Sequence, residues 1–593
     1  MKKLNVFLLL ILFSLISCSH PKVNSSATNI NPLNQLFAEY WEQHAKLFPL
    51  EATQQGDNRY NDILPNDQTE QSRKEIQDFY KQYLTRLEKI DRLSLNDNDK
   101  ISYDTFKFEM EEQLAIGKSD LWMIPFQQFW GLPLTMGQIG SGEQYQPFKT
   151  VKDYDNWLAR VKGFVTWSDS AILNFKAGIK NKFVLPKSLI KKIIPQFVAL
   201  QVKDPTKSIF YGPITKMPAD FSAQDKARLT KAYQEMILKD IVPTYKKLTH
   251  FLSHEYLKNG RNSDGISSLK GGKNIYSLLA RYWTTTEKTP EEIYQIGLKE
   301  VARIHDEMEA VKEQVQFKGS LQQFFNHLKV SKGFYPYQSA SEVLNAFYQI
   351  HNRIKPKLET LFGKKPKTPF EIRQTEDFRA ASSSAEYNQG SPDGSRPGIF
   401  YVPIVDAKKF NYTSGMESLF LHEAIPGHHY QISLQQENES LPTFRRFAWY
   451  GAYGEGWALY TESLGKELGL YTDPYQYIGA LGDEMHRAVR LVVDVGIHLK
   501  GMSREQAIDY MMKNEPISKD GAIAEIERYM AIPGQALSYK IGSLKIRELR
   551  EKYQKELGAK FSLSAFHDEF LKDGCLPLAV VEAKMDEWER KLK

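Results

Sequence analysis

The amino-acid sequence predicts a mainly α-helical protein that contains one small β-sheet insert. Apolar residues recur three and four positions apart along most of the chain, and helix start signals precede several of these stretches. Proline, glycine and serine, which interrupt helices, concentrate in one segment, Phe370–Val405. With 41% hydrophobic and 25% charged residues in a chain of 593, the composition is that of an ordinary globular protein.

The N-terminus has the pattern of an export signal. Met1–Lys3 is basic, and Leu4–Ile16 is mostly apolar but too short to span a bilayer as a stable helix. The run ends at Cys18 and resembles a bacterial lipoprotein signal. We therefore expect a signal peptide over residues 1–17, a lipid on Cys18 that anchors the protein at the cell envelope facing the periplasm, and a flexible tether over residues 18–31. Cleavage to a free protein is the alternative.

The net charge and the cysteine content exclude further classes of protein. The formal charge is +6, and it falls to +4 once Lys2 and Lys3 are removed with the leader. No basic run with interleaved aromatic residues occurs, so we expect no nucleic-acid partner. Cys575 stands alone in the body of the chain, which excludes an intrachain disulfide there.

From about residue 32 the sequence pattern is helical almost throughout. Thr289–Glu292 and Ser503–Gln506 have the form of capping boxes, and Pro243 is expected to kink or break the helix around it. Because no linker is evident, we expect residues 32–593 to form one large domain, with two lobes around a cleft as the alternative. The clearest helical stretches are 33–48, 71–93, 151–179, 223–257, 290–315, 522–530 and 535–557.

The segment Phe370–Val405 departs from the helical pattern. It contains A-S-S-S-A and S-P-D-G-S-R-P-G, which favour turns, and then I-F-Y-V-P. Ile399–Val402 is short, β-branched and aromatic, so it is predicted to be a strand. A small sheet is therefore expected just ahead of the next helix.

A histidine–glutamate motif follows, in the stretch L-H-E-A-I-P-G-H-H-Y-Q that begins at Leu421. Ser414–Glu417 has the form of a capping box, so a helix is expected to lead into His422. In the common H-E-x-x-H motif the histidines lie one helical turn apart and bind one zinc ion, and the glutamate polarises a bound water. Glu423 would be that glutamate, but Pro426 occupies the position of the second histidine.

The second histidine ligand is therefore His428 or His429, six or seven positions after His422. Pro426 and Gly427 make a regular helix unfavourable at this point, because proline removes a backbone donor and clashes with the preceding turn. A local bulge would return His428 to the metal and turn His429 elsewhere. We favour His428, and His429 is kept as the alternative.

A zinc site that performs catalysis needs a third protein ligand and an open position for water. Glu455, in G-A-Y-G-E-G-W-A-L-Y-T-E, is the candidate for that ligand. Glu462 lies on nearly the same helical face and is predicted to hold a ligand histidine from behind. Two solvated surface acids are the alternative interpretation.

H-E-A-I-P-G-H-H-Y-Q followed by E-G-W-A-L-Y-T-E resembles the motifs of a large bacterial family of secreted proteins and lipoproteins of unknown function. The resemblance runs from Leu33 to the C-terminus and includes D-G-S-R-P-G-I-F-Y-V and P-G-Q-A-L-S-Y-K-I-G. It implies a large helical zincin-like metallopeptidase fold with a central cleft, related to gluzincin peptidases of the angiotensin-converting-enzyme kind. It also implies one zinc ion per chain and a peptide substrate. Aligning the Gly-His pairs again favours His428.

The catalytic roles follow from the addition of water to an amide. Glu423 is expected to accept the proton of a zinc-activated water and pass it to the leaving amine. The resemblance suggests Tyr539 as the donor to the oxyanion, with His498 as second choice; a core aromatic is the alternative for Tyr539. Asp494, spaced with His498 on one helical face, is a candidate for supporting the site from behind, or belongs to a solvated face.

Substrate contacts are predicted in the insert. Arg396 is a candidate fork for a peptide carboxylate, or it fixes its own turn. Ile399 and Tyr401, on the predicted strand, are candidates for pairing with extended substrate backbone. Two competing functions remain open: a surface lipoprotein that binds ligands through a degenerate metal site, and a zinc hydrolase of non-peptide amides or esters.

Overall fold

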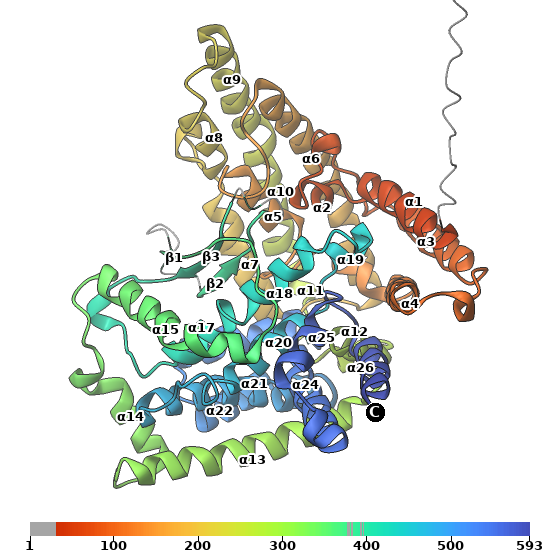
Figure 1. The fold of residues 1–593 in the computed structure, drawn as a ribbon. Helices are drawn as coiled ribbons and strands as arrows, with labels where there is room; N and C mark the ends of the chain where they lie inside the picture. The colour runs from red at the N-terminus through yellow and green to blue at the C-terminus, as the bar shows by residue number, and fades with distance from the viewer. Residues whose placement is uncertain (1–30, 376–379, 381–383, 392–393, 395) are drawn as a thin grey trace, which may run out of the picture.

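Helices make up most of the chain in a computed structural model, and this confirms the prediction of a mainly helical protein (Figure 1). The structure describes residues 31–375, 380, 384–391, 394 and 396–593. The predicted leader and Cys18 lie outside the described residues. None of the helices in the described part combines the length and apolarity needed to cross a bilayer.

The helices of the first half of the chain surround two apolar cores. The longest, α6, begins at a true capping box on Thr150 and contributes buried aromatic residues along one face. The helices are α1 (Pro32–Leu47), α2 (Pro49–Gln54), α3 (Glu70–Leu87), α4 (Asp97–Gly117), α5 (Leu132–Gly140), α6 (Val151–Asn181), α7 (Lys187–Ala199), α8 (Gly212–Thr215), α9 (Ala223–Met236), α10 (Val242–Phe251), α11 (Leu257–Asn259), α12 (Gly272–Thr284), α13 (Pro290–Gln314), α14 (Leu321–Val330) and α15 (Ala340–Leu361).

The helices of the second half hold the histidine–glutamate motif. They pack around a further apolar core that includes the buried Trp457 and Phe420. They are α17 (Met416–Glu423), α18 (His428–Glu437), α19 (Thr443–Arg446), α20 (Gly451–Ser463), α21 (Pro474–Leu499), α22 (Arg504–Asn514), α23 (Lys519–Ala531), α24 (Ser538–Leu557), α25 (Leu563–Leu571) and α26 (Leu578–Leu592).

Three strands form a small mixed sheet within the described residues, in the order β1-β3-β2. The central strand β3 (Gly398–Val402) pairs in parallel with β1 (Phe370–Gln374) and antiparallel with β2 (Glu386–Asn388). Phe400 of β3 is fully buried and packs against Phe347 of α15 and Phe420 of α17. The sheet therefore lies against the helix that leads into His422, as predicted.

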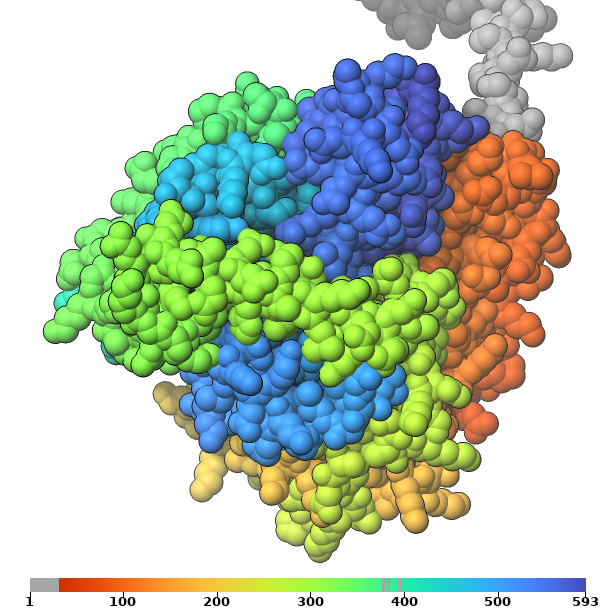
Figure 2. All heavy atoms as spheres, turned by 90° about the horizontal axis from the view of Figure 1, so that it is seen from below, coloured from red at the N-terminus to blue at the C-terminus, as the bar shows by residue number. Residues whose placement is uncertain are grey.

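Helix α21 is the long buried element beneath this helix. α13 covers it: Arg303 of α13 pairs with Glu484 of α21 at 2.7 Å, and a Cβ on Gly297 would lie 2.7 Å from Leu491 Cβ. Seen from below, the light-green segment that contains α13 crosses the face of the molecule (Figure 2). Because α21 is enclosed in this way, the charged residues along it have little access to water.

Two predictions about helix ends are wrong. Ser414 does not form a capping box: its hydroxyl bonds Asn411 O, the N-cap is Gly415 with φ 77°, and Glu417 pairs with Arg353 at 2.7 Å. Pro243 does not break its helix. α9, the π-helical segment Ile237–Ile241 and α10 follow one another without a gap, and Val242 N–H bonds Ile237 O in the π-helical pattern just before Pro243. The missing N–H of Pro243 therefore falls where the regular α-helical bonding is already interrupted. The boxes at Thr289 and Ser503 are confirmed.

The first prediction concerns the contact between α20 and α24, which cross through glycines. A Cβ on Gly542 would lie 1.9 Å from Ala452 O and 2.8 Å from Gly456 Cα. We expect Gly542→Ala to lower the free energy of unfolding by about 1–3 kcal/mol, because the two helices must separate. Thermal unfolding measures this.

Gly482→Ala on α21 is the matched control. Its Cβ would meet nothing closer than Pro516 Cγ at 4.0 Å, and alanine gains up to about 1 kcal/mol of helix propensity. A Gly542→Ala protein that melts at the wild-type temperature would contradict the close contact.

Candidate metal centre

The chain breaks its helix between Glu423, the last residue of α17, and His428, the first residue of α18. The Ile425–Pro426 peptide bond in this break is cis. Gly427 is required by the tightness of the turn, because a Cβ there would lie 1.9 Å from His422 O. The predicted interruption at Pro426 and Gly427 is therefore present, and it separates His422 from His428 onto two helices.

Helix α20 holds this break in place. The indole of Trp457 donates to Pro426 O at 2.9 Å, and Thr461 Oγ1 donates to Leu421 O at 2.8 Å. Leu421 lies in the last turn of α17 and Pro426 lies in the break, so neither carbonyl has an intrahelical donor there. These bonds therefore satisfy two backbone acceptors that the helix break leaves open. This role of Trp457 was not predicted; its only signal in the sequence is a tryptophan between the two candidate glutamates.

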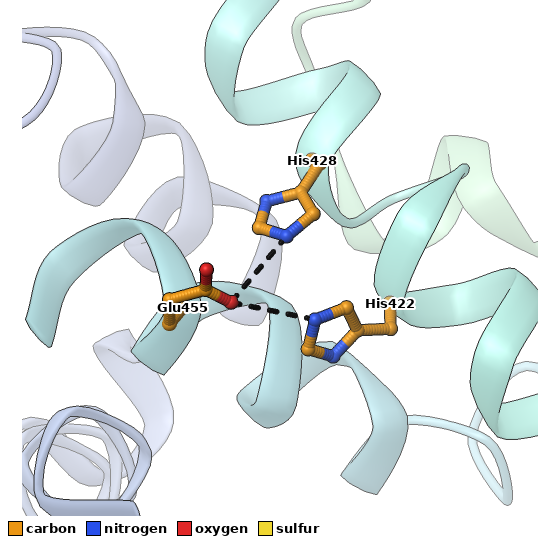
Figure 3. A group of neighbouring side chains, drawn as sticks. All are labelled: His422, His428 and Glu455. Carbon is orange, nitrogen blue, oxygen red and sulfur yellow. Dashed lines mark ion pairs between the residues drawn. The ribbon is translucent and has the colours of Figure 1, made fainter. Parts of the chain in front are cut away.

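His422, His428 and Glu455 converge from α17, α18 and α20 (Figure 3). One ligand atom from each lies within 4.8 Å of the others. Glu455 Oε2 is 3.5 Å from Nε2 of His422 and 3.5 Å from Nε2 of His428. All three side chains are largely buried.

These separations fit a metal ion better than direct hydrogen bonds. Around a tetrahedral zinc with ligand bonds of ~2.0–2.2 Å, neighbouring ligand atoms lie ~3.3–3.5 Å apart. A hydrogen bond between imidazole and carboxylate would be shorter, at ~2.7–2.9 Å. Glu455 Oε2 is buried and has no hydrogen-bond donor among the described residues. Two imidazoles and one carboxylate are the ligand set of a zinc site that keeps one position for water.

Glu462 lies behind the first histidine. Its Oε1 is 2.7 Å from His422 Nδ1, so the ring is fixed with Nε2 directed at Glu455. Burial disfavours the imidazolium form of His422, but Glu455 and Glu462 outweigh this and raise its pKa to about 10. Burial also opposes the charge of Glu455, yet His422 and His428 hold the pKa of its carboxyl well below the ordinary value. The site therefore keeps its carboxylate ionised.

Glu423 lies at the end of α17, next in sequence to His422, and only partly buried. Burial raises the pKa of its carboxyl, while the charges of the nearby histidines and of Arg487 lower it. Within the described part of the chain, no hydrogen bond holds this carboxylate. It is therefore available to a water molecule beside the cluster.

The adjacent His429 faces the sheet rather than the cluster. Its Nδ1 lies 3.0 Å from Tyr387 Oη, and its ring packs on Phe370 with centroids 5.0 Å apart. Burial lowers the pKa of His429 to about 4. Of the two histidines that the sequence left open, the structure brings His428 to His422 and Glu455.

Tyr539 is not part of the cluster, and its contacts are with arginines of α21 and α23. Tyr539 is in the first turn of α24. Its neighbour Ser538 packs against Gly451 of α20, where an added Cβ would lie 3.2 Å from Ser538 Oγ. Gly451 is one helical turn before Glu455. The Arg490 guanidinium lies over the Tyr539 ring at 4.6 Å from the centroid. The Tyr539 hydroxyl accepts from Arg528 at 3.5 Å, a long contact.

His498 and Asp494 are not brought to the cluster. On α21 the residue whose charge acts on Glu423 is Arg487. Asp494 and His498 lie two to three turns further along this helix, roughly 10–16 Å at 1.5 Å per residue. His498 accepts from Ile266 N at 3.1 Å and bonds Tyr529 O at 3.0 Å. Asp494 accepts from Tyr276 Oη and from Gly534 N. Both residues therefore form buried hydrogen bonds between α21 and the elements that cover this face of it.

The predicted substrate contacts of the insert are wrong in part. Ile399 and Tyr401 lie on the central strand, and both edges of β3 already pair with β1 and β2, so no substrate strand can add to it. Arg396 is exposed and borders a surface pocket that contains none of the three ligand candidates. Its N–H donates to Ser391 Oγ at 2.9 Å, within its own turn.

The fold and the site define a mainly helical protein with a cluster of two histidines and one glutamate at a helix break. The chain belongs to the family described as "Bacterial protein of unknown function (DUF885)", whose model matches residues 49–585. This confirms the family predicted from the motifs.

Two solved structures are similar to the chain. One, "the putative lipoprotein from Colwellia psychrerythraea", is 28% identical, with a TM-score of 0.87 over 94% of this chain and 99% of that one. Another, from Shewanella oneidensis and described as "a putative lipoprotein of unknown function", is 20% identical, with a TM-score of 0.74 over 93% of this chain and 99% of that one. Among curated proteins none is significantly similar.

The second prediction separates the two adjacent histidines by metal content. We expect His428→Ala to weaken zinc binding at least about 100-fold, because it removes one of three ligands, whereas His429→Ala stays close to wild type. Zinc retained after dialysis, measured by elemental analysis, gives the result. Equal zinc content in the two variants would contradict the assignment of His428.

The third prediction concerns His498 as an interior residue. Burial lowers its folded-state pKa to about 3, against about 6.5 in the unfolded chain. Below pH 6.5 the unfolded state therefore binds a proton that the folded state does not, and stability falls as the pH decreases towards 3. Below pH 6.5 we expect the free energy of unfolding to fall less steeply with decreasing pH in His498→Gln than in the wild type, by up to about 1.4 kcal/mol per pH unit.

Urea unfolding of both proteins at several pH values between 7 and 4 measures this slope. The two lost hydrogen bonds of His498 lower the stability of the variant at every pH and leave the slope unaffected. If the free energy of unfolding depended on pH as steeply in His498→Gln as in the wild type, the buried neutral imidazole would be refuted.

Proposed function

We propose that the protein is an exported zinc-dependent metallopeptidase that hydrolyses short peptides on a helical, zincin-like scaffold. The observation that supports this best is the spacing of 3.5 Å between Glu455 Oε2 and each of two imidazole nitrogens. Glu423 beside this set provides the acid–base group that hydrolysis needs. His422, His428 and Glu455 would hold one zinc ion.

Zinc, when bound, supplies Lewis acidity that polarises a water and the substrate carbonyl. Glu423 accepts a proton from the attacking water and delivers it to the leaving amine, a role favoured by its raised pKa and open carboxylate. Glu462 keeps the His422 ring in its tautomer and orientation. Tyr539, half-buried near the first turn of α20, is the candidate donor to the oxyanion.

The N-terminal signal and Cys18 support export with a lipid anchor at the cell envelope. The two similar structures come from proteins that are themselves described as lipoproteins. A lipid-anchored peptidase facing the periplasm would meet short peptides there.

A binding protein with a degenerate metal site has less support. Such a protein has no need of a carboxylate beside the metal ligands, whereas Glu423 is present and not hydrogen-bonded to any described residue. A zinc hydrolase of non-peptide amides or esters would use the same residues, and a substrate screen distinguishes it.

The fourth prediction tests Glu423. We expect Glu423→Gln to lower the rate of peptide hydrolysis by at least about 10²-fold, because the amide cannot accept the proton of the water. Zinc content should be unchanged, because Glu423 is outside the ligand set. The readout is cleavage of a peptide mixture, followed by mass spectrometry, alongside elemental analysis.

Glu437→Gln is the matched control. This carboxylate lies at the far end of α18 and bonds the backbone of Lys367 and Thr368. Zinc binding without hydrolysis of any peptide, amide or ester by the wild type would overturn the proposed function and favour the binding protein.

A further inference from the structure

Helix α21 runs alongside α17 in the same direction. Near the start of α17, Gln476 Nε2 donates to Tyr412 O at 2.7 Å, and further on Ser418 Oγ donates to Asp483 Oδ2 at 2.6 Å. One more turn along both helices brings Arg487 to the level of the His422–Glu423 pair. The register of the two helices therefore places an arginine beside the candidate metal centre.

The charge of Arg487 acts on the groups of the site. It lowers the pKa of Glu423, and Glu462 in turn raises that of Arg487 against the effect of burial. Arg487 also borders a cavity of about 460 Å³ together with Asp483 and His486. Arg487 is thus coupled to Glu423 on one side and borders an open space large enough for amino-acid side chains.

Arg487 and its neighbour Arg490 are incompletely bonded. Arg487 Nη1 donates to the backbone of Asp483 at 3.1 Å, with the Asp483 carboxylate 3.6 Å away, and its buried Nε has no acceptor among the described residues. Arg490 donates to Tyr529 Oη at 2.9 Å and to Glu525 at 3.0 Å, and its buried Nη1 likewise finds no acceptor in the described part of the chain. Buried donors that lack a partner are costly, so an anionic ligand would relieve both.

Neither guanidinium has a carboxylate to itself. Glu525 is shared by Arg490, by Arg528 at 3.8 Å and by His486 at 3.5 Å. Asp483, on the same helix as Arg487, is 3.6 Å from it and also accepts from Ser418, while Glu462 acts on Arg487 from α20 and is itself bonded to His422. The carboxylates around the two arginines are therefore engaged with other groups as well.

We propose that Arg487 and Arg490 form a carboxylate-binding subsite, so that the preferred substrates are peptides with a carboxylate close to the cleaved bond. This inference rests on the proposed peptidase function. Arginine binds carboxylates through paired N–H donors, and burial strengthens such bonds. The structure thus assigns to α21 the role that the sequence analysis gave to Arg396.

The geometry sets the reach of the subsite. Arg487 and Arg490 are three residues apart on one helix, about 4.5 Å along its axis, and an extended peptide spans ~3.3–3.6 Å per residue. A carboxylate one or two residues beyond a bond held next to Glu423 would meet this pair. The carboxylate is supplied either by the peptide C-terminus or by an aspartate or glutamate side chain.

The fifth prediction is tested by binding rather than turnover, with the full chain carrying Glu423→Gln and loaded with zinc. Calorimetry compares three short peptides of otherwise neutral sequence: one with a free C-terminus, its C-terminal amide, and the amide with one glutamate. We expect the free acid to bind about 10- to 100-fold tighter than the amide, as for a charged hydrogen bond. Recovery of affinity by the glutamate peptide would identify the side chain as the second source.

Arg487→Gln in the same background should reduce the difference between acid and amide to below about threefold. Arg504→Gln is the matched control, because Arg504 of α22 is likewise paired with a carboxylate, that of Glu527 on α23. The acid–amide comparison is made first with both arginines intact, so it does not depend on the folding of a variant. Equal affinities for all three peptides, or no binding of any, would overturn the subsite. Hydrolysis is scored separately with Glu423 intact, so its absence rejects the peptidase and leaves the binding result to stand.

Discussion

The hydrogen bond from Trp457 to the carbonyl of Pro426 is the constraint on which the site depends. It fixes the gap between α17 and α18 against α20, and Thr461 adds a second bond to the end of α17. α20 is in turn pressed on α24 through Gly456 and Gly542, with no side chains between them. Because Glu455 belongs to the same helix as Trp457, the bonds that shape the break also set the distance from Glu455 to both histidines.

Electrostatics determines which positive charge this arrangement holds when no metal is bound. Glu455 and Glu462 flank one buried imidazole, so the metal-free protein places a proton on His422, with its pKa raised to about 10. A divalent cation would replace that proton and neutralise Glu455 at the same time, which couples metal binding to proton release. In the metal-free protein the charges of Glu455 and Glu462 are thus balanced by the proton on His422, and in the proposed zinc form the ion would balance them.

The fold class, the family and the position of the small sheet were predictable, because helical periodicity, long motifs and a cluster of helix breakers are local signals. Pro426 and Gly427 likewise predicted the helix break. Tertiary contacts were not predictable. Ile399–Val402 was predicted as a strand, but nothing in the sequence showed that β1 and β2 would pair with both edges of that strand. His498 shares a helical face with Arg487, yet lies too far along α21 to meet the cluster.

Diffraction at the zinc absorption edge from a crystal grown with zinc tests the central claim most directly. The account predicts one anomalous peak, at ~2.0–2.2 Å from Nε2 of His422, Nε2 of His428 and a carboxylate oxygen of Glu455. A peak bound by His429, or zinc only at sites away from the break between α17 and α18, would contradict it.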